Sequence, residues 1–314
     1  MSKILITGFS GCIGSATVDY LFSQGVEQVV GLSRTGVKDR LSEDAAGRIV
    51  VEQVDISDVI ALEAMFKKYR PDAIVHLAAL QTPDCQSHPF WGMDVNLSGT
   101  VNLFKAAALL GSDLQRLVFA SSAAVYGPRA IYAGTTVSPS DPYAPVNLYG
   151  YWKTAGEGMA QAYHMETGVP TVSIRLSTTY GPGRDKGLTS APTSAMKAVA
   201  AGEAFEIPYD GREQYHYVKD VGAGFAQCAI EEFDDYGVFN LRGETIRTSE
   251  FVERLSDVAG ELGMSSQVKV ADNPMEYPFA CDLSEVETLK AFPKMPKTDM
   301  RDGIRESLKF FAGK

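Results

Sequence analysis

Short apolar runs alternate with stretches of helical periodicity through the first half of the chain. Most of these runs are apolar at consecutive positions and not only at alternate ones, which is typical of parallel strands buried on both faces of a sheet. They predict strands at residues 4–7, 28–33, 49–55, 73–79, 117–121 and 171–176.

Helical patterns fill the intervals between these strands. One helix is predicted directly after the glycine-rich stretch that follows the first strand, and others at residues 57–69, 90–110 and 147–167. The helix at 57–69 ends before Pro71, because proline disfavours helical backbone at the residue before it. The repeated order of strand and helix predicts an α/β fold with a doubly wound parallel sheet of the Rossmann type.

The regular alternation ends after residue 176. Tyr180-Gly181-Pro182-Gly183 marks a turn, and the last third of the chain mixes short strands and helices without a second regular sheet. We predict a Rossmann domain over residues 1–175, rejoined by about residues 212–243. Residues 176–211 and 244–314 are predicted to form a smaller mixed α/β substrate-binding region.

The composition excludes several classes of protein. Hydrophobic residues make up 45% and charged residues 22% of the 314 residues, as in ordinary globular proteins. The net charge of −10 opposes a nucleic-acid-binding surface, which needs clustered Lys and Arg. The four cysteines and four histidines lack metal-ligand spacing, so we expect neither a metal site nor disulfide bonds. No apolar run approaches the roughly 18 residues of a membrane span, and the N-terminal run is too short for a signal peptide, which predicts a cytoplasmic protein.

The loop after the first strand carries glycines at positions 8, 11 and 14. Such glycines permit a tight turn, close approach of the backbone to a pyrophosphate, and close packing of helix on strand. The helix that follows offers unpaired N–H groups to phosphate, and its place after the first strand favours a cofactor site over a plain turn. The predicted dinucleotide contacts in this loop are Gly8, Ser10, Gly11, Cys12, Ile13 and Gly14.

The ends of the second and third strands indicate which dinucleotide binds. Ser33 and Arg34 stand where an NAD enzyme usually places an acidic residue, and they suit a ribose 2′-phosphate. NADP is therefore favoured and NAD is the alternative, in which Arg34 stacks on adenine or points into solvent. Asp55 and Ile56 are predicted to contact the adenine, whereas Asp58 suits either this role or the start of the next helix.

Tyr149 and Lys153 lie four residues apart in the predicted helix 147–167, so they share one helix face. A tyrosine normally titrates near pH 10 and needs a nearby cation to act as a base near neutrality. Lys153 and an oxidised nicotinamide together favour the phenolate.

With the segment Ser121-Ser122-Ala123-Ala124-Val125-Tyr126-Gly127, these motifs resemble the extended short-chain dehydrogenase/reductase superfamily of NAD-dependent epimerases and dehydratases. The resemblance runs from residue 1 to about Asp220 and includes residues 72–79 and 96–100. It implies that Ser122 bonds the reacting oxygen, that Tyr149 moves the proton, and that Lys153 holds the nicotinamide ribose and lowers the tyrosine pKa. It further implies cofactor contacts from Leu77, Ala78, Ala79 and Asn96, and a homodimer through the helices near residues 92–110 and 149–166.

Three departures from the family pattern bear on the substrate. Ala123 and Ala124 stand where sugar-nucleotide 4,6-dehydratases carry an acidic pair, so water elimination is not expected. Thr178 replaces an asparagine of nucleotide-sugar enzymes, and Glu213 replaces their diphosphate-binding arginine. If Glu213 faces the pocket, its carboxylate repels a diphosphate, and the adjacent Arg212 compensates only if the backbone bulges.

We therefore predict an NAD(P)-dependent oxidoreductase in which Tyr149 is the acid/base. It transfers hydride between nicotinamide and a secondary alcohol or lactol of a free sugar or sugar acid. The alternative is a UDP-sugar epimerase with the same Ser/Tyr/Lys triad and tightly bound NAD. A cofactor-binding scaffold without chemistry is disfavoured, because the tyrosine and the lysine are both present. Arg175, Arg184, Lys186 and Arg212 are candidate carboxylate anchors or ordinary structural charges, and Ser122, Ala123 and Thr178 complete the candidate substrate contacts.

Overall fold

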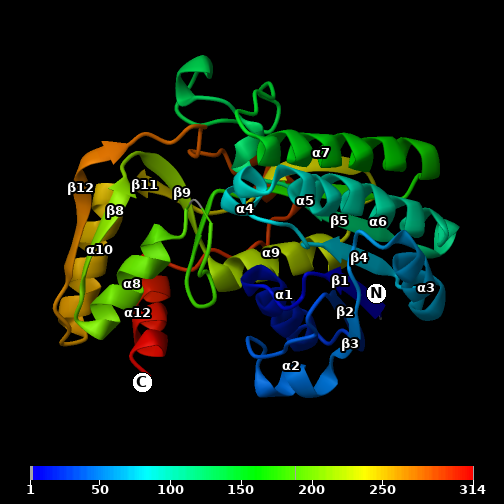
Figure 1. The fold of residues 1–314 in the computed structure, drawn as a ribbon, viewed down its shortest axis with the longest axis horizontal. Coiled ribbons are helices and arrows are strands. Elements are labelled where there is room, and N and C mark those ends of the chain that lie inside the picture. Colours follow the sequence, from blue (N-terminus) through cyan, green and yellow to red (C-terminus); the bar gives the residue numbers. More distant parts are fainter. Residues whose placement is uncertain (1–2, 188, 314) are drawn as a thin grey trace.

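A parallel sheet of seven strands forms the centre of the computed structural model, which describes residues 3–187 and 189–313 (Figure 1). The strand order is β10-β6-β5-β4-β1-β2-β3, and every neighbouring pair is parallel. This order confirms the predicted doubly wound sheet. The strands are β1 (Lys3–Thr7), β2 (Gln28–Ser33), β3 (Val50–Gln53), β4 (Ala73–His76), β5 (Arg116–Ala120), β6 (Thr171–Arg175) and β10 (Tyr236–Asn240).

Helices cover both faces of this sheet. Ile4 and Ile6 of β1 belong to a core shared with α1 (Cys12–Ser23) and α9 (Val218–Ile230). Leu5, which points to the opposite face, belongs to a second core with α3 (Val59–Tyr69), α6 (Gly99–Ala108) and α7 (Leu148–Thr167). Burial on both faces explains why consecutive positions of the central strands, such as Ile4-Leu5-Ile6 of β1 and Ile74-Val75 of β4, are apolar.

The predicted single helix at 90–110 is divided into three segments. α5 (Pro89–Met93) and α6 are joined by a π-helical turn at Asp94–Ser98. Single π-turns of this kind frequently mark functional sites, and this one carries Asn96. Two short helices, α2 (Glu43–Arg48) and α4 (Thr82–Ser87), lie in segments where the sequence pattern predicted none.

The C-terminal region adds two small sheets and four helices. One sheet joins β7 (Thr178–Tyr180), β9 (Arg212–Tyr217) and β11 (Glu244–Arg247), and the other joins β8 (Ala204–Tyr209) to β12 (Gln267–Met275). The helices are α8 (Ala191–Ala201), α10 (Thr248–Glu261), α11 (Val286–Ala291) and α12 (Met300–Phe311). In Figure 1, α8, α10 and α12 lie at the end of the molecule opposite α3 and α6.

The segment 212–243, predicted to rejoin the first domain, contributes to both the C-terminal region and the seven-stranded sheet. Its strand β9 pairs in the three-stranded sheet, whereas α9 packs on α1 and β10 extends the seven-stranded sheet. The domain boundaries themselves stay a prediction. Among residues 3–187 and 189–313, no helix has the length and apolar character needed to cross a bilayer, and no His, Cys, Asp and Glu side chains cluster as metal ligands.

Candidate active site

A cavity of about 280 Å³ opens at the carboxyl ends of β1, β2 and β4. In the sheet, β1 is flanked by β2 on one side and by β4 on the other, so the strand order reverses direction at β1. Doubly wound sheets bind their ligands at this reversal. The lining includes thirteen of the predicted cofactor contacts: Gly8, Ser10, Gly11, Cys12, Ile13, Gly14, Ser33, Arg34, Asp55, Ile56, Leu77, Ala78 and Ala79. The cavity is also lined by Arg184, which was predicted as a substrate contact, and by six residues that were not predicted: Leu32, Thr35, Val54, Leu80, Gln81 and Val95.

The glycine loop has the geometry of a phosphate cradle. Gly8 adopts a φ of 73°, and a Cβ there would lie 2.8 Å from the backbone nitrogen of Ala78. A Cβ on Gly14 would lie only 2.2 Å from the Gly8 carbonyl oxygen. Gly11 is the N-cap residue of α1 and offers no side-chain cap, so the first N–H groups of this helix remain available to an anion. These residues fit the pyrophosphate of a dinucleotide.

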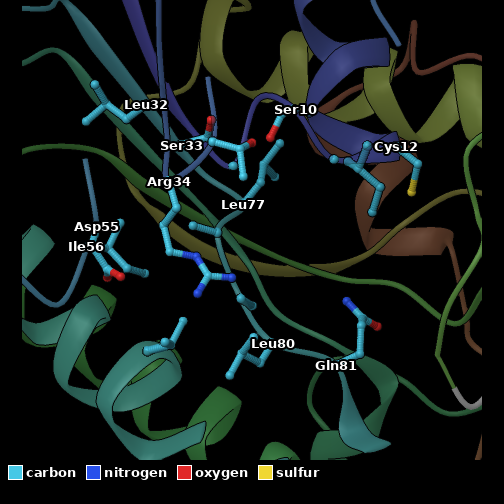
Figure 2. A pocket seen from close by; sticks show the side chains of 18 of the residues that line it. Ser10, Cys12, Leu32, Ser33, Arg34, Asp55, Ile56, Leu77, Leu80 and Gln81 are labelled. Carbon is cyan, nitrogen blue, oxygen red and sulfur yellow. The ribbon is translucent and has the colours of Figure 1, made fainter. Parts of the chain in front are cut away.

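Arg34 extends into the cavity from the end of β2 (Figure 2). Its guanidinium carbon lies 5.3 Å from the ring centroid of Trp91, which suits a cation–π contact. No ion pair among the described residues involves Arg34, so its charge is available to a phosphate. The Ser33 hydroxyl accepts a hydrogen bond from the Gly36 N–H at 3.0 Å.

The two aspartates that follow β3, Asp55 and Asp58, have different roles. Asp55 lines the cavity, and its Oδ1 accepts hydrogen bonds from the backbone N–H and the hydroxyl of Ser57 at 2.9 and 2.8 Å. Asp58 instead caps α3 by accepting from the Ala61 N–H at 3.0 Å. Asp58 is therefore a helix-capping residue.

A buried hydrogen-bond chain holds the cavity wall formed by residues 77–80. The Thr7 hydroxyl accepts from the Ala78 N–H at 3.2 Å and lies 2.7 Å from His76 Nδ1. His76 Nε2 lies 3.1 Å from the Thr100 hydroxyl, which donates to the Asn96 carbonyl. Burial, followed by the charge of Lys153, lowers the pKa of His76 to about 3, so this histidine is a neutral structural residue.

Asn96 acts on the cavity through Leu80. Its Oδ1 accepts from the Leu80 N–H at 2.7 Å and its Nδ2 donates to the Leu80 carbonyl at 3.0 Å. Leu80 lines the cofactor cavity, whereas Asn96 is buried behind it. Asn96 was predicted to contact the cofactor. In this structure it does not line the cavity, and it instead fixes the backbone of Leu80, which does.

A second cavity adjoins the first and contains all three predicted catalytic residues, Ser122, Tyr149 and Lys153. Five residues line both cavities: Ile13, Leu77, Ala79, Gln81 and Arg184. We call this second space the reaction cavity. Its remaining lining residues are Thr82, Ala120, Ser121, Ala124, Leu176, Ser177, Thr179, Thr189 and Phe279.

The start of α7 is packed directly on the turn that carries Ser122. Asn147 caps this helix by accepting from the Gly150 N–H at 2.9 Å. A Cβ on Gly150 would lie 2.1 Å from the Ala124 carbonyl oxygen, so only glycine allows this approach. The contact brings Tyr149 and Ser122 into the same cavity.

Burial dominates the titration of the catalytic pair. Burial raises the pKa of Tyr149 to about 12, while the Arg184 charge and a hydrogen bond from Ser122 oppose this rise. Burial also lowers the pKa of Lys153 to about 8, and its Nζ donates to the Ala120 carbonyl at 2.6 Å. The resemblance implies that Lys153 lowers the tyrosine pKa. In this structure the groups that oppose the rise of that pKa are Arg184 and Ser122, and Lys153 Nζ lies 5.5 Å from the centroid of the Tyr149 ring.

The other predicted substrate contacts differ in their positions. Ser122 and Arg184 line the reaction cavity, but Ala123 and Thr178 are buried and do not. Arg212 lies instead at a separate cavity beside Arg129 and Arg247. Two further candidate anchors are also elsewhere: Arg175 is fully buried in an ion pair, and Lys186 is exposed.

Glu213 is fully buried, so the condition under which it would repel a diphosphate, that it faces the pocket, is not met. It accepts hydrogen bonds from the hydroxyls of Thr178, Tyr215 and Thr248. These hydroxyls come from β7, β9 and the start of α10, so the carboxylate lies in the interior of the small region. Burial raises the pKa of Glu213, and the surrounding hydroxyls limit the rise. Its charge therefore does not meet a substrate directly.

The family model described as "NAD dependent epimerase/dehydratase family" matches residues 4–241. The dTDP-glucose 4,6-dehydratase 1 of Escherichia coli (strain K12) is 31% identical over 340 residues, covering 98% of this chain and 92% of the relative. The UDP-glucose 4-epimerase of Mycolicibacterium smegmatis is 28% identical over 320 residues, covering 99% of both chains. Among solved structures, the UDP-glucose 4-epimerase of Thermus thermophilus in complex with NAD is 27% identical, with a TM-score of 0.82 over 99% of both chains.

Proposed function

The chain belongs to the NAD-dependent epimerase/dehydratase family of short-chain enzymes, and from this premise we propose that it is a nucleotide-sugar epimerase. One observation carries the proposal: Ser122, Tyr149 and Lys153 line one cavity that adjoins the cavity lined by the glycine loop. The UDP-glucose 4-epimerases among its relatives supply the substrate class.

The protein's own groups account for the proton transfer. A bound nicotinamide supplies the hydride acceptor. Tyr149 Oη takes the proton of the sugar hydroxyl, and the Ser122 hydroxyl bonds the same oxygen as it becomes a carbonyl. In an epimerase the same tyrosine returns the proton after the hydride has been delivered to the other face of the sugar. Lys153, held by the Ala120 carbonyl, contributes positive charge beside the phenolate.

Water elimination is not supported by this cavity. A dehydratase needs an acid and a base beside the leaving hydroxyl. Ala123 and Ala124 carry only methyl groups, and no Asp or Glu is among the described residues that line the reaction cavity. The site therefore suits hydride transfer without elimination, although several relatives are dehydratases.

A second candidate is a dehydrogenase of a free sugar or sugar acid. Thr178 and Glu213, at the two positions where nucleotide-sugar enzymes recognise their substrate, bond each other in the interior. Neither offers positive charge to a diphosphate. This observation favours a smaller substrate.

The cofactor is an NAD-type dinucleotide, and we propose that the cavity accepts both NAD and NADP, with NADP the tighter. The NAD complex of the Thermus thermophilus relative supports NAD. The unpaired guanidinium of Arg34 supports NADP, because it offers an opposite charge to the 2′-phosphate.

We also propose that two copies associate through α6 and α7. Leu109 follows α6, and Tyr151 and Met165 lie on α7, where they leave 45%, 57% and 78% of their surface exposed. Sedimentation velocity tests this. We expect a dimer that the variant Tyr151→Glu/Met165→Glu converts to a monomer, whereas a monomeric unmodified protein would remove the proposal.

The purified protein, with no cofactor added, is incubated with UDP-glucose and UDP-galactose and the products are separated by chromatography. An epimerase interconverts the two sugars without net reduction of cofactor, and Tyr149→Phe abolishes the conversion. Stoichiometric reduction of added NAD or NADP by free sugars or sugar acids, with no interconversion, would replace the epimerase by the dehydrogenase.

A further inference from the structure

Arg184 lies where the cofactor cavity and the reaction cavity meet, and it lines both. It belongs to the segment between β7 and α8, in which Gly181, Gly183 and Gly187 all have positive φ. A Cβ on Gly187 would lie 2.7 Å from Arg184 Nη2, so a glycine at 187 leaves room for the guanidinium. The segment thus delivers one cation into the reaction cavity.

The guanidinium of Arg184 is incompletely satisfied. Within residues 3–187 and 189–313, its Nη1 and Nη2 donate only to neutral oxygens, Gln81 Oε1 at 3.3 Å and Thr189 Oγ1 at 3.4 Å. Its Nε is buried and has no hydrogen-bond partner in the part of the chain that the structure describes. The adjacent Asp185 pairs with Arg40 at 3.1 Å and with Lys197, and not with Arg184.

The rest of the reaction cavity offers this cation no counter-charge. Its described lining contains no carboxylate, and its second cation, Lys153, donates to the Ala120 carbonyl. Thr179, which is 1% exposed and lines the cavity, has a hydroxyl without a partner among the described residues. A positive, hydroxyl-lined cavity is stabilised when an anion enters it.

We propose that Arg184, with the hydroxyls of Thr179 and Thr189, is the subsite for a carboxylate on the substrate, so that the substrate is a sugar acid. A planar guanidinium suits a carboxylate because it donates two parallel hydrogen bonds. Tyr149 and Ser122 line the same cavity, so the carboxylate belongs to the sugar that reacts and not to a remote part of the substrate. The inference rests on the proposed oxidation of a sugar hydroxyl, and it applies to a free sugar acid and to a nucleotide-linked one.

Calorimetric titration of the protein saturated with NAD tests the subsite by matched pairs. The pairs are UDP-glucuronate with UDP-glucose, D-glucuronate with D-glucose, and D-gluconate with sorbitol. In at least one pair the acid should bind about 10- to 100-fold more tightly than its neutral partner, as expected for hydrogen bonds to a charged group. A preference in the UDP-sugar pair indicates a nucleotide-linked substrate, and a preference in one of the other two pairs indicates a free sugar acid.

Substitutions locate the preference. Arg184→Gln should bring the affinities for the acid and its neutral partner close to equality, because only binding of the acid is weakened. Arg184→Lys should keep part of the preference for the acid. Arg40→Gln is the matched control, because Arg40 holds the same segment through Asp185 but does not line the reaction cavity. It should keep the full preference.

Three outcomes would overturn the subsite. They are parity within every pair, a preference that survives in Arg184→Gln, and a loss of NAD affinity in that variant with an unchanged acid-to-neutral ratio. Tighter binding of D-glucose 6-phosphate than of any acid would replace the carboxylate by a phosphate. A preserved acid preference without any UDP-sugar interconversion would reject the proposed epimerase and leave the subsite standing.

Discussion

The Arg175 guanidinium and the Glu157 carboxylate form a two-point ion pair that is fully shielded from solvent. Nε donates to Oε1 at 2.8 Å and Nη2 donates to Oε2 at 2.7 Å. Ser121 also donates to Glu157, and Tyr143 does so at 2.7 Å. Glu157 lies one helical turn after Lys153, so this cluster fixes the catalytic helix α7 to β5 and β6.

The variant Glu157→Gln should therefore destabilise the fold strongly. It leaves the buried Arg175 charge without an anion, and removing one partner of a buried ion pair typically costs about 3–5 kcal/mol. Urea unfolding followed by circular dichroism measures the loss. Asp44→Asn, which breaks the exposed pair with Arg48, should cost less than about 1 kcal/mol. Equal losses in the two variants would contradict the role given to the buried pair.

The seven-stranded sheet was largely predictable because its signal is local. A strand buried on both faces is a continuous apolar run, and six such runs correspond to β1–β6. The seventh strand, β10, begins 61 positions after β6 ends. It lies within the segment 212–243 that was predicted to rejoin the first domain, but its place beside β6 depends on tertiary packing. The glycine loop was predictable for the same local reason, since its spacing encodes backbone geometry.

The contacts of individual polar side chains were less predictable. Arg175 was a candidate carboxylate anchor, yet its partner lies 18 residues earlier on another element. Whether Glu213 faces the substrate was left open, because the sequence does not show that hydroxyls from Thr178 and Thr248, distant along the chain, surround this carboxylate. The reaction-cavity residues Thr179 and Thr189 carry no motif of their own, and their signal is only their proximity to the Tyr180-Gly181-Pro182-Gly183 turn.

Tyr149→Phe should abolish turnover and keep cofactor affinity. The hydroxyl that it removes is the proton carrier, and Tyr149 lines the reaction cavity but not the cofactor cavity. General acid–base groups contribute about 10²- to 10⁴-fold to rate, so the loss should be at least this large. Steady-state rates and calorimetric titration of NAD are the two measurements. Turnover like that of the unmodified protein would remove Tyr149 from the mechanism.

Arg34→Asp should weaken NADP far more than NAD. The substitution replaces attraction by repulsion at the place expected for the 2′-phosphate, and NAD has no such group. Loss of one charge-assisted hydrogen bond to the 2′-phosphate should raise the dissociation constant of NADP, relative to that of NAD, by at least about 10-fold. Thr35→Ala, in the same cavity wall without a charge, is the control. An unchanged ratio would show that Arg34 does not bind the 2′-phosphate and contacts Trp91 instead.

His216 should make the fold sensitive to acid. Its Nε2 accepts from the Ser177 N–H at 3.0 Å and its Nδ1 lies 3.0 Å from the Arg242 carbonyl, which defines a neutral ring. Burial lowers its pKa from 6.5 to about 4, so the unfolded chain binds this proton more readily than the folded one. Its contribution is present above about pH 6.5 and is lost as pH falls toward 4, by about 3 kcal/mol in all.

Urea midpoints measured from pH 7 to pH 4.5 check this sign. His76, whose pKa is lowered to about 3, adds to the same loss, so the unmodified protein should weaken steadily over this range. His216→Gln keeps an acceptor and a donor but does not titrate. It should show a smaller fall in stability between these pH values, and a fall as steep as that of the unmodified protein would exclude His216 as a source.

The last prediction concerns the pH dependence of catalysis and follows from Tyr149 and Arg184. Oxidation needs the Tyr149 phenolate, and burial raises the pKa of this tyrosine to about 12. The phenolate fraction, and hence kcat for oxidation, should rise about tenfold per pH unit through the neutral and mildly alkaline range. Arg184 opposes the rise of the pKa, so Arg184→Gln should move the alkaline limit of the profile to still higher pH. The variant should therefore be slower at pH 8 and recover partly at pH 10, whereas Arg40→Gln should follow the unmodified profile. A flat profile in the unmodified protein, or a loss in Arg184→Gln that is constant with pH, would show that this charge does not act on the tyrosine.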